Sequence, residues 1–156
     1  IHFKEVDVKE ALPFDDNQFD IVINRHGLIN EKEIYRILKP NGIFITEQVG
    51  AENDRGLVEL LYENSPKLPY PEEYVAIAKE KFKNAGFSIL HAQEAFRPIY
   101  FYDVGALVWF AKVLPWEFPN FSVKNNLKGL YKAQKQLERK GFVEAQIHRY
   151  LLIAKK

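Results

Sequence analysis

The sequence of 156 residues contains no cysteine and no methionine. Without cysteine there can be no disulfide, no thiolate metal site and no cysteine nucleophile, and a reducing compartment such as the cytoplasm is expected. Because the chain begins at Ile1 and has no methionine, we expect that a segment upstream is missing. The longest apolar stretch, near 104–114, is too short and too interrupted to span a bilayer, and no signal-peptide pattern is present. We therefore expect a soluble protein with no membrane partner.

An excess of charge of one sign is also missing. Lys and Arg number 22 against 21 Asp and Glu, which gives a net charge of +1, and neither sign forms a long block. This balance gives no support to a nucleic-acid partner, and we expect none. The histidines show no mutual spacing that indicates a metal site, and no serine has the context of a nucleophile elbow, so we expect neither a metal nor a hydrolase.

Apolar residues make up 47% of the chain and aromatic residues 14%, enough to build a globular core. Asn30 with Glu33 three residues later predicts a helix N-cap with its capping-box partner. Strand-like runs separated by helices of moderate length predict an α/β fold with an open, mostly parallel sheet and helices on both faces. The predicted strands are 1–8, 19–23, 43–49 and 87–90, and the predicted helices are 31–38, 57–62 and 72–85.

The last third of the sequence breaks this alternation. Residues 96–116 are rich in aromatic side chains, an amphipathic helix is predicted from 123 to 137 with its end near Gly141, and 148–154 is a final strand. We therefore divide the chain into a core at 1–95, an aromatic and helical insertion at 96–141, and a final strand at 142–156.

Polar side chains follow three of the predicted strands, where an open α/β sheet usually binds its ligand. Asp7, the triplet 24–26 and Glu47 come directly after apolar runs. A carboxylate at one strand end could accept an exocyclic amine, and backbone groups at another could hold a polar ligand tail. The pattern suits a ligand that contains a nucleoside.

Two segments resemble the middle of class I S-adenosylmethionine-dependent methyltransferases of the small-molecule type. They are Leu12-Pro13-Phe14-Asp15-Asp16-Asn17-Gln18-Phe19-Asp20-Ile21-Val22 and Glu33-Ile34-Tyr35-Arg36-Ile37-Leu38-Lys39-Pro40-Asn41-Gly42. The resemblance extends along nearly the whole chain, to a bacterial subgroup of uncharacterised members, with Asn41 in place of one family glycine. It implies a partial Rossmann-like sheet with a final antiparallel strand. The family's glycine-rich turn is absent, and no G-x-G occurs anywhere, so the S-adenosylmethionine site is expected to be incomplete and this chain alone inactive.

The resemblance also implies roles for single residues. Asp7 and Val8 would lie beside the adenine ring, through the side-chain carboxylate and the backbone amide respectively. The spacing from Asp7 to Leu12 is one residue longer than is usual in the family. Glu10 is therefore an alternative to Asp7 as the acidic residue beside the adenine. Asn24, Arg25 and His26 would lie beside the methionine end of the cofactor.

For an acceptor that is a hydroxyl or a protonated amine, His26 is our first expectation for the base and Glu47 the second. Aromatic faces tolerate a cationic methyl donor and can line an acceptor pocket. The expected pocket residues are Tyr102, Trp109 and Trp116, and the insertion at 96–141 that contains them would be an acceptor-binding or lid region.

Each residue has a structural alternative. His26 could be a capping residue, Asp7 could cap a turn, Arg25 could be an ion-pair partner, and the aromatic residues could be core. Two other functions also stay open. The alternative that ranks second, after methyl transfer, is a non-catalytic module that forms a homodimer or docks a partner through an exposed sheet edge. The alternative that ranks third is a nicotinamide-dependent oxidoreductase.

Overall fold

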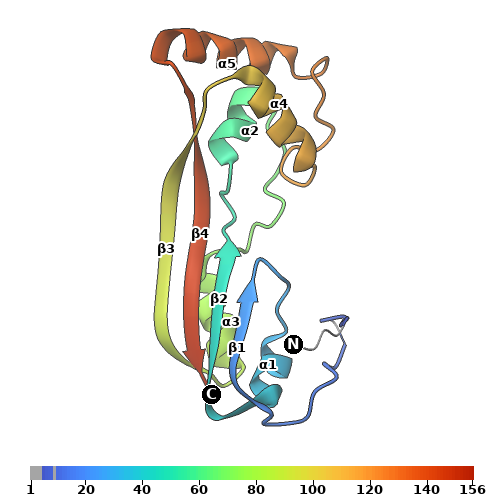
Figure 1. Cartoon of the computed structure of the whole chain (residues 1–156), viewed down its shortest axis with the longest axis vertical. Coiled ribbons are helices and arrows are strands. Elements are labelled where there is room, and N and C mark those ends of the chain that lie inside the picture. The colour runs from blue at the N-terminus through green and yellow to red at the C-terminus, as the bar shows by residue number, and fades with distance from the viewer. Residues whose placement is uncertain (1–4, 9) are drawn as a thin grey trace. The chain divides into compact units, whose positions relative to one another are not determined.

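The computed structural model describes residues 5–8 and 10–156 (Figure 1). Its strands form one sheet in the order β1-β2-β4-β3. In the described part of the chain no helix has the length and apolarity needed to cross a membrane. The elements are β1 (Phe19–Arg25), α1 (Glu31–Ile37), β2 (Leu38–Val49), α2 (Arg55–Leu61), α3 (Val75–Asn84), β3 (Ser88–Phe101), α4 (Val104–Val113), α5 (Leu127–Lys140) and β4 (Val143–Lys155).

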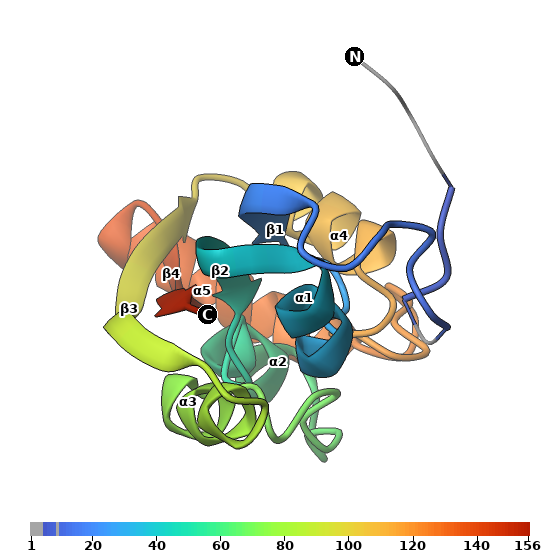
Figure 2. The ribbon, with the colours of Figure 1, turned by 90° about the horizontal axis from the view of Figure 1, so that it is seen from below.

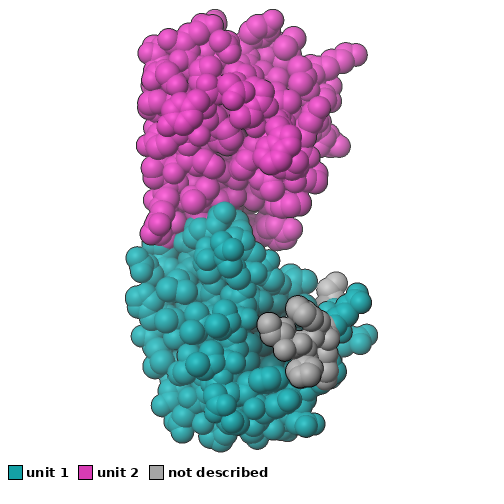
Figure 3. Space-filling view, viewed as in Figure 1, with its two compact units in different colours: residues 1–50, 72–94, 149–156 teal, residues 51–71, 95–148 magenta. Residues whose placement is uncertain are grey.

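The chain divides into two compact units (Figure 3). Unit 1 contains residues 1–50, 72–94 and 149–156, and unit 2 contains residues 51–71 and 95–148. The predicted division into 1–95, 96–141 and 142–156 is a division of the sequence and stays a prediction. In the structure, residues 51–71 belong to the same compact unit as helices α4 and α5. The predicted first strand lies partly outside the described residues, and 5–8 are not in a strand.

Helices α1, α2 and α3 begin and end within three residues of the predicted positions, whereas α5 begins at Leu127 rather than at 123 and α4 was not predicted. The ends that were predicted have local causes. Asn30 caps α1, since its Oδ1 accepts a hydrogen bond from the Glu33 backbone N–H at 3.3 Å. Gly86 follows α3 with φ 103°, and Gly141 follows α5 with φ 82°, a conformation that costs glycine little. The signals at helix ends were therefore sufficient to place α1, α3 and the end of α5.

The sheet differs from the predicted one. β1 and β2 pair in parallel, and β2 and β4 pair antiparallel, which confirms the expected final antiparallel strand. The sheet as a whole, however, is mostly antiparallel rather than mostly parallel. The error arose because the alternation of strand and helix stops after β3, and the long strand β4 inserts beside β2 from the far end of the sequence. Only a short parallel pair remains.

The core of unit 1 lies on one face of its sheet. Ile34 and Ile37 of α1 and Phe82 of α3 pack in the same cluster with Phe44 of β2 and Leu152 of β4. Figure 2 shows α1 and α3 on the same side of β1 and β2. The prediction of helices on both faces is therefore wrong for unit 1, where the described residues place no helix on the second face.

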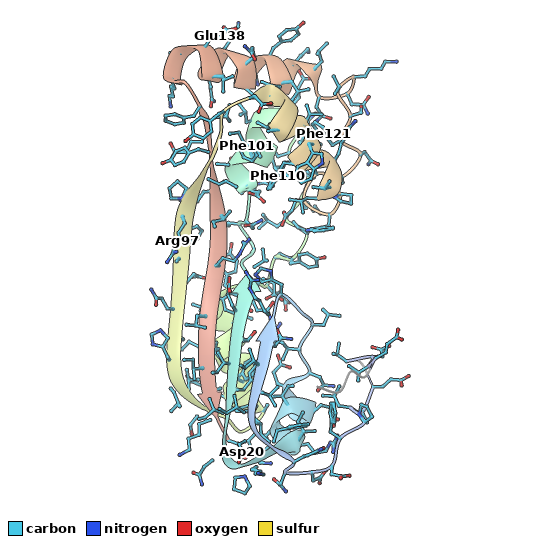
Figure 4. All side chains as sticks on the ribbon, in the orientation of Figure 1. Asp20, Arg97, Phe101, Phe110, Phe121 and Glu138 are labelled. Atoms are coloured by element: carbon cyan, nitrogen blue, oxygen red, sulfur yellow. The ribbon has the colours of Figure 1, made fainter. Side chains whose placement is uncertain are left out.

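Unit 2 has its own core, built where α2, α4 and α5 meet the ends of β3 and β4. The rings of Phe101 and Phe110 meet edge to face with centroids 5.1 Å apart (Figure 4). α5 approaches α2 so closely that a Cβ added to Gly129 would lie 2.3 Å from the Leu61 carbonyl oxygen. Glycine at this position is therefore required by helix packing.

Candidate functional site

The parallel pair β1 and β2 brings the predicted polar residues to one end of unit 1. In the register of the pair, Asn24 lies beside Thr46 and Arg25 lies beside Glu47. Because parallel strands end on the same side of a sheet, residues 22 positions apart in sequence become neighbours. The sequence-predicted residues Asn24, Arg25, His26 and Glu47 are thus brought together.

Asn24 is the centre of a hydrogen-bonded network. Its Oδ1 accepts from Thr46 Oγ1 at 3.2 Å and from Gln48 Nε2 at 2.6 Å. Gln48 Nε2 also donates to the Gly27 carbonyl oxygen at 3.1 Å. Thr46 and Gln48 are buried, so Asn24 supplies an acceptor that solvent cannot replace. The network fixes the loop after β1 against the end of β2.

His26, Glu47 and Arg25 form a second group at the same strand ends. His26 Nε2 lies 3.5 Å from Glu47 Oε1, and Arg25 Nε donates to Glu47 Oε2 at 3.1 Å. The hydrogen bond from Arg25 holds the pKa of the Glu47 carboxyl below its usual value, and the nearby His26 adds a smaller lowering. The Glu47 carboxylate therefore stays ionised at neutral pH and lies between the Arg25 and His26 side chains.

The backbone at His26 is unusual. Its φ is 54°, in the left-handed region that residues other than glycine seldom adopt, and its N–H donates to the Glu47 carbonyl oxygen at 3.0 Å. Conformations of this kind persist where surrounding contacts hold them, often at functional sites. This backbone hydrogen bond to Glu47 of β2 therefore fixes the position of the His26 imidazole on the turn that follows β1.

An apolar hollow of about 320 Å³ adjoins the Asn24 network. Asn24 and Asn30 are the polar side chains on its wall, and Asn30 Nδ2 donates to the Val8 carbonyl oxygen at 3.3 Å. Its remaining lining is apolar and comes from the segment before β1, from β1 and from α1: Val6, Val8, Leu12, Phe14, Phe19, Ile21, Val22, Ile23, Leu28, Ile34 and Ile37. A flat apolar group with a polar edge fits such a surface.

The two candidates for the adenine contact lie on the segment that leads into this hollow. Val8 lines it, whereas Asp7 and Glu10 are exposed, and the Glu10 N–H donates to the Asp7 carbonyl oxygen at 3.1 Å. Neither Asp7 nor Glu10 belongs to the residues that line the hollow, so the choice between them stays open.

The segment is held by Glu33 and Arg36 of α1. Glu33 Oε2 accepts from the Leu12 N–H at 2.8 Å and from Arg36 Nη2 at 2.8 Å. Arg36 also donates to the Phe14 carbonyl oxygen and pairs with Asp16 at 2.7 Å. The Glu and Arg of the resemblance motif therefore have a structural role that the capping-box interpretation missed, which is to fix the turn before β1.

The predicted acceptor residues belong to unit 2. Tyr102, Trp109 and Trp116 lie at or near α4, and 71%, 66% and 52% of their surfaces are exposed. They are not core, and the apolar hollow of unit 1 does not include them. Their assignment to an acceptor pocket stays a prediction.

Sequence reasoning missed two kinds of polar residue. Thr46 and Gln48 were passed over as members of a β-rich run, although polar residues at alternate positions of a buried strand are a signal of an internal network. In unit 2, His148 is fully buried, its Nδ1 accepts from the Glu52 N–H at 3.1 Å, and Asn53 Nδ2 donates to Asp54 at 2.6 Å. Among the described residues no group of three or more His, Asp or Glu could hold a metal ion.

Comparison with known proteins gives the class of this fold. Residues 1–46 match the model of a methyltransferase domain family. A protein of Bacillus halodurans C-125 assigned as a methyltransferase has a similar structure, with a TM-score of 0.59 and 17% identity over 97% of this chain and 70% of that one. The YcgJ protein of Bacillus subtilis follows with a TM-score of 0.53 and 16% identity over 94% of this chain and 67% of that one.

Taken together, the match of residues 1–46 and the structural likeness show that this chain has part of the class I S-adenosylmethionine-dependent methyltransferase fold. Its sequence finds no significant match among curated proteins. The chain spans only 55% of the length of the [4+2]-cyclase SpnF, to which it is 20% identical with a TM-score of 0.49. The activity, acceptor and partners of the whole protein are therefore matters for proposal.

Proposed function

We propose that this protein transfers a methyl group from S-adenosylmethionine to a small-molecule acceptor, and that this chain contributes one part of the cofactor site. The observation that supports the proposal is the apolar hollow along the edge strand β1, which reaches Asn24 near the carboxyl end of that strand. An adenine ring has the flat apolar face and polar edge that suit its walls. Bound S-adenosylmethionine supplies a methyl group that is already activated by its sulfonium.

In this proposal the residues of this chain bind and orient the cofactor, and one of them accepts a proton from the acceptor. Asp7 or Glu10 and the backbone of Val8 meet the adenine, and Asn24 and Arg25 lie toward the methionine end. His26 takes the proton that a hydroxyl or ammonium acceptor loses, and Glu47, oriented by Arg25, stabilises the imidazolium that results. The geometry favours His26 over Glu47 as the base, because the Glu47 carboxylate already accepts a hydrogen bond from Arg25, which lowers its pKa and weakens it as a base. The apolar walls of the hollow would also exclude water from the bound cofactor.

Tyr102, Trp109 and Trp116 are proposed to meet the acceptor. Their exposed rings offer electron-rich faces to a small or aromatic molecule and tolerate a cationic donor. A reducing compartment such as the cytoplasm suits a chain without cysteine.

The test is calorimetric titration of S-adenosylhomocysteine into this chain and into the product of the intact gene. Binding by the intact product, with weak or no binding by this chain, supports the proposal. Absence of binding by an intact product that is demonstrably folded overturns it. Asp7→Asn and Glu10→Gln in the intact product distinguish the two carboxylates, since only the variant that removes the adenine contact should weaken binding, by about tenfold for one charged hydrogen bond.

A second candidate function is a non-catalytic module that pairs with another copy of itself through β1. β1 is an edge strand, and its Ile21 and Ile23 have 57% and 73% of their surfaces exposed. An edge strand with exposed apolar side chains and few charges favours pairing with another chain. The measurement that distinguishes this function is the self-association experiment argued at the end of the Discussion.

A further inference from the structure

The outer surface of α5 bears a row of exposed apolar side chains. Leu127 and Tyr131 are one helical turn apart, and Val123 lies one turn earlier in the segment that leads into the helix. Their exposed fractions are 45%, 62% and 45% respectively. The inner side of α5 is already packed into unit 2 through Leu130 and Ala133. The exposed row is therefore additional to the side that stabilises the fold.

A row of cations runs along the same surface. Between Ser122 and Gly141 the sequence has one acidic residue, Glu138, which Figure 4 labels on α5. Lys128 forms an ion pair with Glu63 at 2.7 Å. The basic residues of this segment are all exposed: Lys124, Lys128, Lys132, Lys135, Arg139 and Lys140. The net charge of +1 for the whole chain conceals this local excess.

We propose that the surface formed by residues 123–140 binds the headgroup region of an anionic lipid bilayer, with α5 parallel to the membrane. Lysine side chains reach phosphate and carboxylate headgroups, while Val123, Leu127 and the ring of Tyr131 enter the boundary between headgroups and acyl chains. Such a surface needs neither a membrane-spanning segment nor a high overall charge. The expectation of no membrane partner rested on the absence of these two features.

Lipid fits this surface better than nucleic acid does. Five of the six cations are lysines, which lack the planar fork that arginine presents to phosphates and bases. Tyr131 is the single aromatic side chain among the exposed residues of 123–140, whereas single-stranded nucleic acid is usually bound by several stacking rings. The aliphatic side chains of Val123 and Leu127 have no favourable partner on a phosphate backbone.

Vesicle co-sedimentation tests the proposal with this chain. The vesicles contain either phosphatidylcholine alone or phosphatidylcholine with about 30% phosphatidylserine. The bound fraction should be about tenfold higher with phosphatidylserine and should fall when salt is raised to about 0.5 M. Lys132→Glu with Lys135→Glu, and separately Leu127→Ser with Tyr131→Ser, should each lower the binding by about tenfold.

The matched control is Lys81→Glu with Lys83→Glu on α3, which makes the same change in net charge in unit 1. It should bind anionic vesicles nearly as well as the unaltered chain does. Circular dichroism and the urea midpoint establish that each variant is folded. The proposal is overturned if the folded chain binds no anionic vesicle, or if the control loses as much binding as the α5 variants. Binding to a single-stranded oligonucleotide but not to vesicles also overturns it, in favour of a nucleic-acid surface.

Discussion

At the scale of single residues, the polar side chains that follow β1 divide into two roles. Asn24 faces inward and completes a buried network, whereas Arg25 and His26 face the exposed carboxylate of Glu47. A strand that alternates between its two faces separates neighbouring residues in this way. The two groups should therefore respond differently to substitution.

Asn24→Ala should lower the free energy of unfolding by about 1–3 kcal/mol, because buried Thr46 and Gln48 would lose an acceptor that water cannot replace. Arg25→Ala should lower it by less than about 1 kcal/mol, since 70% of the arginine side chain is exposed. Urea denaturation followed by circular dichroism measures both. Equal losses for the two variants would contradict the division of roles.

Glu33 should make the stability depend on pH. Its hydrogen bond with Arg36 holds its pKa below the ordinary value of 4.5, with a smaller lowering from the Leu12 N–H. A depressed pKa means that the stabilisation is fully present above about pH 4.5 and is lost as the pH falls through the lower pKa of the folded state. Glu33→Gln should therefore lower the urea midpoint at pH 7, and the gap to the unaltered chain should narrow toward pH 3.

Glu80→Gln is the control for this experiment. Glu80 also has a lowered pKa, from the hydrogen bond with Lys83, but its ion pair is on the exposed side of α3. Its removal should shift the midpoint much less. If the gap between Glu33→Gln and the unaltered chain were independent of pH, the ion pair would not be the source of the stabilisation.

The sequence was sufficient to name most of the residues at the candidate site but not their contacts. Polar residues after apolar runs located Asn24, Arg25, His26 and Glu47, because strands that end together bring such residues together. The hydrogen bonds of Glu33 to Leu12 and Arg36 could not be foreseen, since they depend on where the segment before β1 folds back. Helix-capping signals describe only the helix that contains them.

At the scale of elements, the packing of α5 against α2 gives a sharp prediction. A methyl group at position 129 would lie 2.3 Å from the Leu61 carbonyl oxygen, so Gly129→Ala forces the two helices apart. The free energy of unfolding should fall by about 1–3 kcal/mol, as in other overpacked cores. Gly56→Ala in α2 is the control, because nothing lies within 4 Å of its added Cβ, and it should raise stability by up to about 1 kcal/mol.

Both variants exchange glycine for alanine inside a helix, so the intrinsic preference of the residues is the same and packing alone differs. Thermal unfolding measures the two changes on the same scale. A stabilising Gly129→Ala would show that α2 and α5 do not approach each other this closely. The sequence alone could not have distinguished the two glycines, because the contact joins residues far apart in the chain.

At the scale of the whole molecule, the sheet explains both the success and the failure of sequence reasoning. Alternating strands and helices predicted an α/β fold, and the fold is α/β. The direction of most strand pairs was wrong because β4, from the end of the chain, inserts next to β2. Periodicity reports which residues form a strand, but the neighbour of that strand is chosen by long-range packing.

The one-sided core of unit 1 has a consequence for association. β1 is an edge strand, and Ile21 and Ile23 point away from the buried face with more than half of their surfaces exposed. Their neighbours across the strand pair, Ile43 and Ile45, are only half-buried. An apolar sheet face beside an edge strand should bind a second copy of the chain at sufficient concentration.

We therefore expect the molar mass of this chain, measured by light scattering across a concentration series, to rise from monomer toward dimer. Ile21→Lys with Ile23→Lys should keep it monomeric, because two lysines on an edge strand oppose pairing. Ile77→Lys on α3, where 37% of the isoleucine is exposed, is the matched control and should leave the association unchanged. A monomer at every concentration would count against the edge as an interface, and an equal effect of the control would mean that association is driven by apolar surface in general rather than by β1.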